Sequence, residues 1–109
     1  MKEKRRWVYH KDRNHPERKI RVGYIVAEVQ DIHRDPPNSI QKADYKKVIQ
    51  LIRVTHPRVE GKFQIRLGYY LRDAHKRGAK WRWGSQTTFQ ITKPRFLSLL
   101  RKAKASGII

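Results

Sequence analysis

The stretch KFQIRLGYYLR, residues 62–72, alternates strictly between apolar and polar side chains over most of its length. Its odd positions are all apolar or aromatic: Phe63, Ile65, Leu67, Tyr69 and Leu71. Because successive side chains of a strand point to opposite faces, this alternation predicts a strand with one buried face. We expect the even face, which carries Lys62, Arg66, Tyr70 and Arg72, to face solvent.

Residues 80–91 resume the alternation after a polar loop that contains Gly78. Trp81 and Trp83 share one parity with Phe89 and Ile91, and the two stretches together predict an antiparallel hairpin. If both apolar faces turn to one core, the tryptophans join Ile65 inside the protein and Arg82 emerges beside Arg66 and Arg72. This assignment favours a structural role for the two tryptophans, whereas a bulge at Gly84 would reverse the parity and expose one face of the pair.

The segment TKPRFLSLLRKAKASG, residues 92–107, predicts a helix. Thr92 can cap its start, Pro94 suits the first turn and Gly107 suits the stop. Its apolar residues follow the i, i+3, i+4, i+7 spacing of an amphipathic helix: Phe96, Leu99, Leu100 and Ala103. Residues 19–32 predict a strand, and residues 45–54 fit a strand or a helix, with the strand favoured.

Together these segments predict an α+β fold, an antiparallel sheet of about four strands with a C-terminal amphipathic helix packed on one face. A chain of 109 residues suits one compact domain. We divide it into a basic N-terminal arm, residues 1–18, and a single α+β nucleic-acid-binding domain, residues 19–109. Residues 34–39, RDPPNS, predict a turn. The chain has no cysteine, which excludes a disulfide framework and a cysteine-ligated zinc site.

The charge of the chain is strongly positive and unevenly placed. It has 27 lysines and arginines against 9 acidic residues, a formal net charge of +18, and Asp73 is the last acidic residue. Such a composition favours a polyanionic partner, nucleic acid above all. No apolar run approaches the roughly 20 residues that span a bilayer, and the N-terminus lacks the apolar core of a signal peptide. We therefore expect a cytoplasmic protein without a membrane partner, with association with the nucleoid left open.

Residues suited to catalysis are few. The five histidines have no metal-ligand spacing, and no glycine-rich phosphate loop is present. Asp44 followed by Glu60 and Lys62 could form a small metal-dependent nuclease site, although Glu60-Gly61 is more typical of a turn. We expect no enzyme, no cofactor and no metal, with the nuclease as the least favoured alternative. A metal-free ribonuclease that uses histidine, arginine and tyrosine leaves almost no linear signature and stays open.

Cations and aromatic residues are interleaved on the predicted open face and in the loop after it. Lysine and arginine can neutralise phosphates, and Tyr70 can stack on unpaired bases. The sequence therefore predicts a non-catalytic protein that binds single-stranded DNA or RNA. This interpretation depends on Arg66 facing solvent while Ile65 is buried, and the reverse arrangement would contradict it. The predicted contact residues are Lys62, Arg66, Tyr70, Arg72, Lys76, Arg77, Lys80 and Arg82, with Trp81 and Trp83 as further stacking candidates.

The run FQIRLGYYLRDAHKRGAKWRWGSQTTFQITKPRFLSLLRKA resembles the C-terminal half of the positive cofactor four family of single-stranded DNA-binding transcriptional coactivators. The resemblance is carried by Ile65-Arg66, the basic loop 73–82, a short strand at 89–91, and Pro94 with Phe96 at the helix start. It implies a role in transcription or DNA maintenance and a homodimer whose curved sheets grip single strands while the helices help to form the dimer. It implies these nucleic-acid contacts: Arg66, Lys76, Arg77, Lys80 and Arg82.

A second hypothesis is a ribosome-associated protein or another protein that binds structured RNA. In that case the basic segment KEKRRWVYHKDR, residues 2–13, would act as a tail that RNA orders. Competition between ribosomal RNA fragments and oligo-dT separates this hypothesis from the first.

Overall fold

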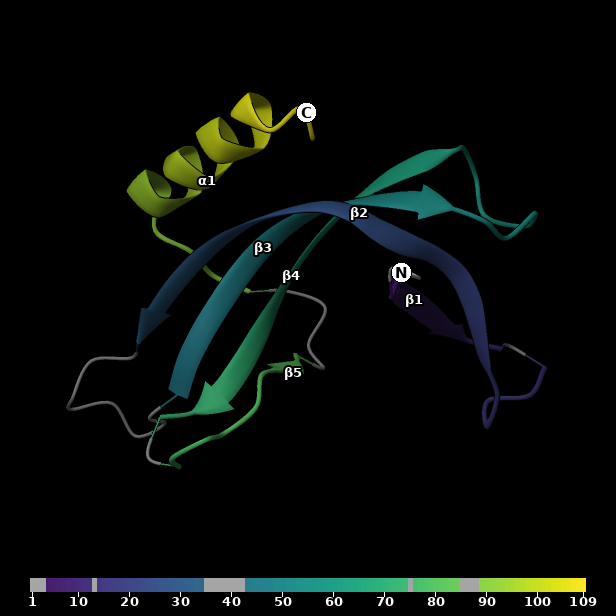
Figure 1. Ribbon diagram of the computed structural model, residues 1–109, viewed down its shortest axis with the longest axis horizontal. Helices are drawn as coiled ribbons and strands as arrows, with labels where there is room; N and C mark the ends of the chain where they lie inside the picture. The colour runs from purple at the N-terminus through teal and green to yellow at the C-terminus, as the bar shows by residue number, and fades with distance from the viewer. Residues whose placement is uncertain (1–3, 13, 35–42, 75, 85–88) are drawn as a thin grey trace.

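Five strands follow one another in chain order to form a single antiparallel sheet, and one helix follows them (Figure 1). The computed structural model describes residues 4–12, 14–34, 43–74, 76–84 and 89–109. The elements are β1 (Arg6–Lys11), β2 (Lys19–Arg34), β3 (Ala43–Val54), β4 (Phe63–Asp73), β5 (Arg82–Trp83) and α1 (Lys93–Ala105). The predicted α+β class is confirmed, with five strands in place of about four. Apart from Arg34, the predicted turn at 34–39 lies outside the described residues.

The additional strand, β1, comes from the segment that the sequence analysis assigned to a basic arm. It pairs with β2 from Arg6 to Lys11, and Val8 is buried against Val22 and Ile52. The prediction of a separate arm at 1–18 was therefore wrong for this strand. Backbone pairing with β2, the burial of Val8 and the contact of Trp7 with Tyr24 hold this strand, and the many cations of the segment led to the prediction of an arm.

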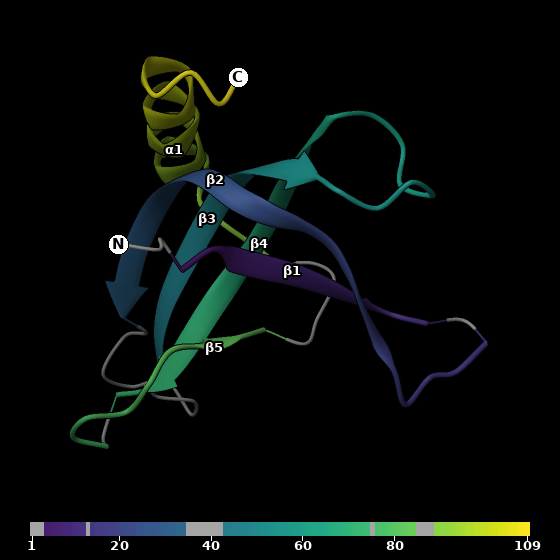
Figure 2. The ribbon, with the colours of Figure 1, turned by 45° about the vertical axis from the view of Figure 1, so that its right-hand side comes forward.

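The sheet is strongly curled. The pairing shifts by one residue between Val8 and Tyr9 and again between Ile25 and Ala27, and such bulges bend a strand and increase its twist. Helix α1 lies on the outer side of the curl, while β1 and β5 lie on the inner side (Figures 1 and 2). We call the outer side the convex face and the inner side the concave face. In β3 and β4 the odd residues point to the convex face and the even residues to the concave face.

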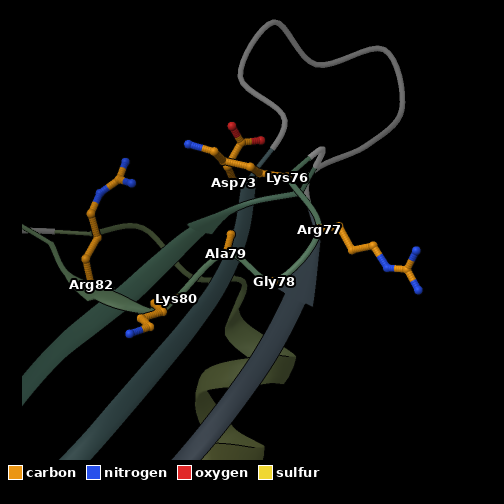
Figure 3. A pocket seen from close by; sticks show the side chains of 7 residues that line it. All are labelled: Asp73, Lys76, Arg77, Gly78, Ala79, Lys80 and Arg82. Carbon is orange, nitrogen blue, oxygen red and sulfur yellow. The ribbon is translucent and has the colours of Figure 1, made fainter.

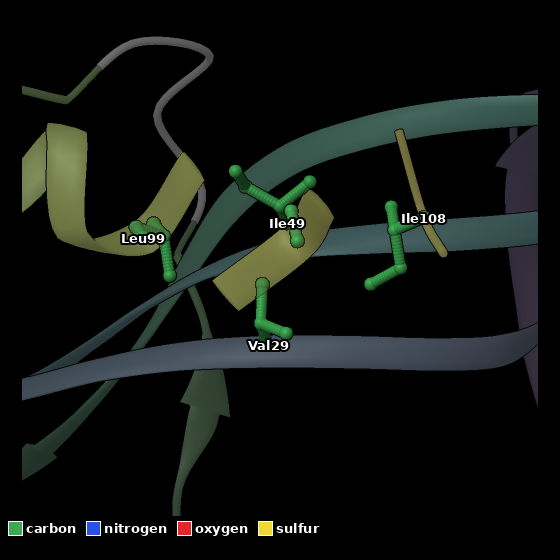
Figure 4. Packing of buried hydrophobic residues seen from close by; sticks show 5 residues of the cluster. Val29, Ile49, Leu99 and Ile108 are labelled. Atoms are coloured by element: carbon green, nitrogen blue, oxygen red, sulfur yellow. The ribbon is translucent and has the colours of Figure 1, made fainter. Parts of the chain in front are cut away.

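Helix α1 covers the convex face over only two strands. It follows Thr92, has Pro94 in its first turn, and ends before Gly107, whose φ of 76° is in the region that favours glycine. Leu99 and Ala103 pack on Val29 of β2 and Ile49 of β3, and Ile108 folds back onto the same cluster (Figure 4). Of the described strands, only β2 and β3 contact the helix.

The predicted burial of residues 62–72 is therefore wrong in its first half. Phe63, Ile65 and Leu67 are on the helix side of the sheet, yet they are 53%, 43% and 50% exposed because the helix does not reach β4. Only Tyr69, further along the strand, is buried as expected. Arg66 points to the concave face, where the curl of the sheet half-buries it.

Candidate nucleic-acid interface

A buried polar network occupies the centre of the concave face. Gln50 is fully buried, and its amide nitrogen donates to Glu28 at 2.6 Å while its carbonyl oxygen accepts from Arg66 Nε at 2.8 Å. Glu28 also accepts hydrogen bonds from Arg6 at 3.2 Å and from Gln30 at 2.6 Å. Burial alone would raise the pKa of Glu28, but hydrogen bonds from Gln50, Gln30 and Arg6 hold it below its ordinary value. No buried side-chain atom of these described residues lacks a hydrogen-bond partner, and satisfied networks of this kind rigidify a fold.

Arg66 belongs to this network, which corrects its predicted role. Its guanidinium is half-buried, and burial lowers its pKa. The predicted open cationic face required Ile65 to be buried and Arg66 to face solvent. The structure has the reverse in this part of β4, with Ile65 in solvent and Arg66 turned inward. The even-numbered residues of β4 therefore do not form an exposed row of cations. Any interface has to be built from other residues, further toward the C-terminal end of the strand.

The two tryptophans lie on the concave face, opposite to the predicted side. Trp83 pairs with Tyr70 and Arg82 pairs with Leu71, so odd residues of β5 face the same way as even residues of β4. The hairpin register sets this relation, and the strand patterns alone do not reveal it. The prediction that Trp81 and Trp83 join Ile65, with Arg82 beside Arg66, was therefore wrong.

Trp83 lies directly on the backbone of Gly68. A Cβ atom at Gly68 would stand 2.1 Å from the Trp83 ring, so glycine is what lets the ring approach the strand. The Arg66 guanidinium lies 4.1 Å from the ring centre, and Tyr70 meets the ring edge-on with 5.0 Å between centroids. Trp83 stays 40% exposed. It is thus held in place on one side and open to solvent on another.

Trp81 and Tyr70 extend this arrangement along the concave face. The Arg72 guanidinium and the Lys46 ammonium lie 4.3 Å and 4.7 Å from the centre of the Trp81 ring. Lys46 is also 5.4 Å from the centre of the Tyr70 ring. We call Tyr70, Trp81 and Trp83 the aromatic row. Cation–π contacts of this kind orient the rings and place positive charge beside them.

A cationic hollow of about 360 Å³ adjoins the aromatic row, at the loop between β4 and β5 (Figure 3). Lys76, Arg77, Lys80 and Arg82 line it, and none of these four forms an ion pair with any residue that the structure describes. Figure 3 shows Arg77 directed to the other side of the loop from Lys80 and Arg82. The remaining lining residues are Asp73, Gly78 and Ala79, and Gly78 makes the turn with a φ of 75°. We refer to this site as the cationic hollow.

A neighbouring hollow of about 240 Å³ contains a carboxylate between two arginines. Asp44 accepts from Arg34 Nε at 2.7 Å and from Arg72 Nε at 2.9 Å. Hydrogen bonds from Arg34 and Arg72 lower the pKa of Asp44 to about 2. Asp44 thereby fixes Arg72 beneath Trp81, so the ion pairs at one end of the sheet position one ring of the aromatic row.

Replacing Asp44 with asparagine should lower the thermal midpoint at neutral pH by a few degrees. The folded-state pKa, about 2, lies below the ordinary value of 3.8, so the carboxylate stabilises the fold above pH 3.8 and loses that effect as the pH falls toward 2. The midpoints of wild type and Asp44→Asn should converge over that interval. Thermal unfolding followed by circular dichroism from pH 2 to 7 measures this. A constant difference between the two proteins at every pH would contradict it.

The structure separates the predicted contact residues into groups. Tyr70, Arg72, Trp81 and Trp83 meet on the concave face, while Lys76, Arg77, Lys80 and Arg82 surround the hollow. Lys62 is exposed just before the start of β4, at the opposite end of the strand from both groups. Sequence reasoning missed Lys46, Arg34 and Arg6. Lys46 lies in the ambiguous segment 45–54, so no signal in the sequence placed it beside the aromatic residues.

The nuclease alternative does not assemble. Asp44 pairs with Arg72 at one end of the β3–β4 ladder, whereas Glu60 precedes Phe63, which pairs with Arg53 at the other end. At roughly 3.3 Å per residue, the ladder from Asp44 to Arg53 is about 30 Å long, so it places the two carboxylates at opposite ends of these strands. Within the described residues, no three side chains of histidine, cysteine, aspartate or glutamate form a group that could hold a metal ion.

Comparisons with known proteins assign neither a family nor a function to this chain. No protein-family model matches the chain, and no curated protein or solved structure matches it. The resemblance to the positive cofactor four family therefore stays a prediction. In the part of the chain that the structure describes, no helix combines the length and the apolar character needed to cross a membrane.

Proposed function

We propose that this protein binds single-stranded nucleic acid without catalysis, with bases on the aromatic row and phosphates in the cationic hollow. One observation carries the proposal: partly exposed tryptophans directly follow, in the chain, loop cations that form no ion pair with any described carboxylate. A single strand exposes its base faces to aromatic side chains, whereas a duplex keeps them stacked inside. The role would be that of an accessory factor in transcription or DNA maintenance, in the cytoplasm or on the nucleoid.

The aromatic row and the cationic hollow would act on different parts of the ligand. Lys76, Arg77, Lys80 and Arg82 would replace the counterions of successive phosphates. Trp81 and Trp83 would stack on bases, with the Arg72 or Arg66 guanidinium already beside each ring. Rings that are held before binding lose little conformational freedom on binding. Lys62 and Arg66 leave the set of direct contacts that the sequence predicted.

The pairing of β1 with β2 favours the single-strand hypothesis over the structured-RNA hypothesis. The latter relied on a basic arm that RNA would order, but Arg6–Lys11 already pairs with β2. Arg6 is further engaged by Glu28 and by the hydroxyl of Tyr70 at 3.0 Å. Much of the predicted arm is therefore part of the fold before any ligand arrives.

A fluorescence titration tests the proposal directly. In a Trp7→Phe background the remaining tryptophans, Trp81 and Trp83, both belong to the aromatic row. We expect oligo-dT or oligo-U to quench them more strongly and at lower concentration than a duplex or a ribosomal RNA fragment. Log K should fall by roughly 0.7 per phosphate contact for each tenfold rise in salt. Equal or tighter binding of duplex, or an affinity that does not change with salt, would overturn the proposal.

A further inference from the structure

The first half of β4 has an open backbone edge. On its outer side, β5 pairs only with Tyr70 and Leu71, and the Gly84 N–H donates to the Tyr69 carbonyl at 2.9 Å. Within the described residues, no strand pairs with the outer edge between Phe63 and Leu67. Exposed edges of this kind can pair with another chain.

The direction of the free backbone groups follows from the contacts of neighbouring residues. The Tyr69 carbonyl points outward to Gly84, whereas the Lys62 carbonyl points inward and accepts from the Val54 N–H at 2.8 Å. Because these directions alternate along an antiparallel strand, odd residues present both backbone groups to the outside. Phe63, Ile65 and Leu67 therefore each offer an outward donor and an outward acceptor that no described strand pairs.

The same three residues carry the exposed apolar side chains of the convex face, and we call them the edge stripe. They are 53%, 43% and 50% exposed, since α1 stops at β3. At the end of the stripe, the Arg53 guanidinium lies 5.0 Å from the centre of the Phe63 ring. Backbone groups and apolar side chains that both need a partner thus coincide on one short segment.

We propose that the edge stripe pairs with the edge stripe of a second copy of this chain, antiparallel and centred on Ile65. In this register Ile65 faces Ile65 of the other copy, and Phe63 faces Leu67. All of these residues are of the odd class, so each facing pair can exchange two backbone hydrogen bonds while its side chains meet on the convex face. The two sheets would continue into each other across a twofold axis.

A second copy fits this segment better than a partner of different chemistry. In a pairing about a twofold axis at Ile65, the apolar side chains at 63, 65 and 67 would face one another, as would the polar ones at 64 and 66. The stripe itself carries no charge, so it offers an acidic partner little complementary charge. The apolar area is on the order of 300 Å² per copy, below the roughly 800 Å² of a stable interface. With a charge of +18 on each copy, we expect a weak dimer that salt strengthens by screening.

This dimer differs from the one that the family resemblance implies, in which the helices take part. It is also independent of the proposed nucleic-acid site, because the edge stripe and the aromatic row occupy opposite faces of β4. The salt dependences have opposite signs. High salt should favour the dimer and weaken nucleic-acid binding, so failure of one proposal can be told from failure of the other.

Sedimentation equilibrium at low and high salt tests the pairing. We expect a reversible monomer–dimer equilibrium at high salt, and Ile65→Lys should weaken it about tenfold or more. Leu97→Lys is the matched control, because Leu97 is 45% exposed on the helix and receives the same new charge. Circular dichroism verifies that both variants fold. A monomer at every concentration and salt, which would leave the stripe to a segment of another protein, overturns the proposal, and so does a dimer that Ile65→Lys leaves intact.

Cross-linking tests the register itself. The chain has no cysteine, so an Ile65→Cys variant carries one thiol per copy, at the proposed twofold axis. Facing residues in a hydrogen-bonded antiparallel pair have Cα atoms about 5.5 Å apart, within the range of a disulfide. Mild oxidation should join the copies rapidly in Ile65→Cys and slowly in the control Leu97→Cys. Equal rates in the two variants would exclude this register.

Discussion

Replacing Arg77, Lys80 and Arg82 together with alanine should weaken binding of a single-stranded oligonucleotide about 100-fold at 0.1 M salt. Each phosphate contact on a single strand contributes about 0.7 units of log K for each tenfold dilution of salt below 1 M, so three contacts contribute about 2 units. The three side chains line the cationic hollow and have no ion pair with any described residue, so their loss should leave the fold intact. The salt slope of log K should become shallower by about 2.

The control for this variant removes the same charge elsewhere. Lys93, Arg101 and Lys104 are exposed on α1, the helix that lies on the opposite side of the sheet from the aromatic row. Their triple alanine variant has the same net charge as the hollow variant. Anisotropy titrations of both proteins over a range of salt separate local contacts from general attraction. Equal losses in the two variants would mean that binding depends on net charge alone, with no contribution specific to the hollow.

Several elements of the fold could be predicted from their residue patterns. The helix start at Thr92 and Pro94, the stop at Gly107, and the strand at 62–72 all appear within one or two residues of their predicted positions. The segment 45–54 was ambiguous for a physical reason. Val48 and Ile49 are adjacent and both buried, because β3 is covered on its two faces. A strand covered on both faces has no alternation, and its pattern then fits a helix equally well.

The burial of β4 could not be predicted from its sequence. An alternating pattern shows which residues share a face of the strand, but it does not show what covers that face. The odd residues do lie on the helix side, but the helix packs on Val29 and Ile49 of β2 and β3. The even residues lie on a concave face that Gln50 and Glu28 close with a buried network. Those two polar residues come from other strands, so nothing within 62–72 indicates that Arg66 has partners.

The candidate site could likewise be predicted only in part, because part of its geometry depends on how strands pair and not on the local sequence. The loop cations around Gly78 depend only on the local sequence, and the hollow brings them together as a group. The side of the sheet on which Trp81 and Trp83 lie depends on the hairpin register, in which Trp83 pairs with Tyr70. A change of one residue in that register reverses the two faces of β5. The sequence therefore identified the residue types of the site, while the geometry that joins them required the structure.

Replacing both Trp81 and Trp83 with leucine should cost about 100-fold or more in affinity for a single strand, since stacking contributes roughly 1–3 kcal/mol per base. Leucine keeps apolar cover over Gly68 and beside Arg72 but offers no flat ring for a base. Because no phosphate contact is lost, the salt slope of log K should stay that of the wild type. Anisotropy of a labelled oligonucleotide over a range of salt gives both quantities.

Trp7 provides the matched control for this change. It packs edge-on against Tyr24, with the Arg21 guanidinium 4.6 Å from its ring centre, so it resembles the other two tryptophans in its contacts. Its register partner Tyr24 pairs with Arg53, which points to the convex face, and Trp7 therefore lies outside the aromatic row. Trp7→Leu should leave affinity unchanged. If it weakens binding as much as the double variant does, stacking on the concave face is wrong. If the double variant instead lowers the salt slope with little loss of affinity at high salt, the tryptophans act by orienting Arg72 and Lys46 toward phosphates, and the bases lie elsewhere.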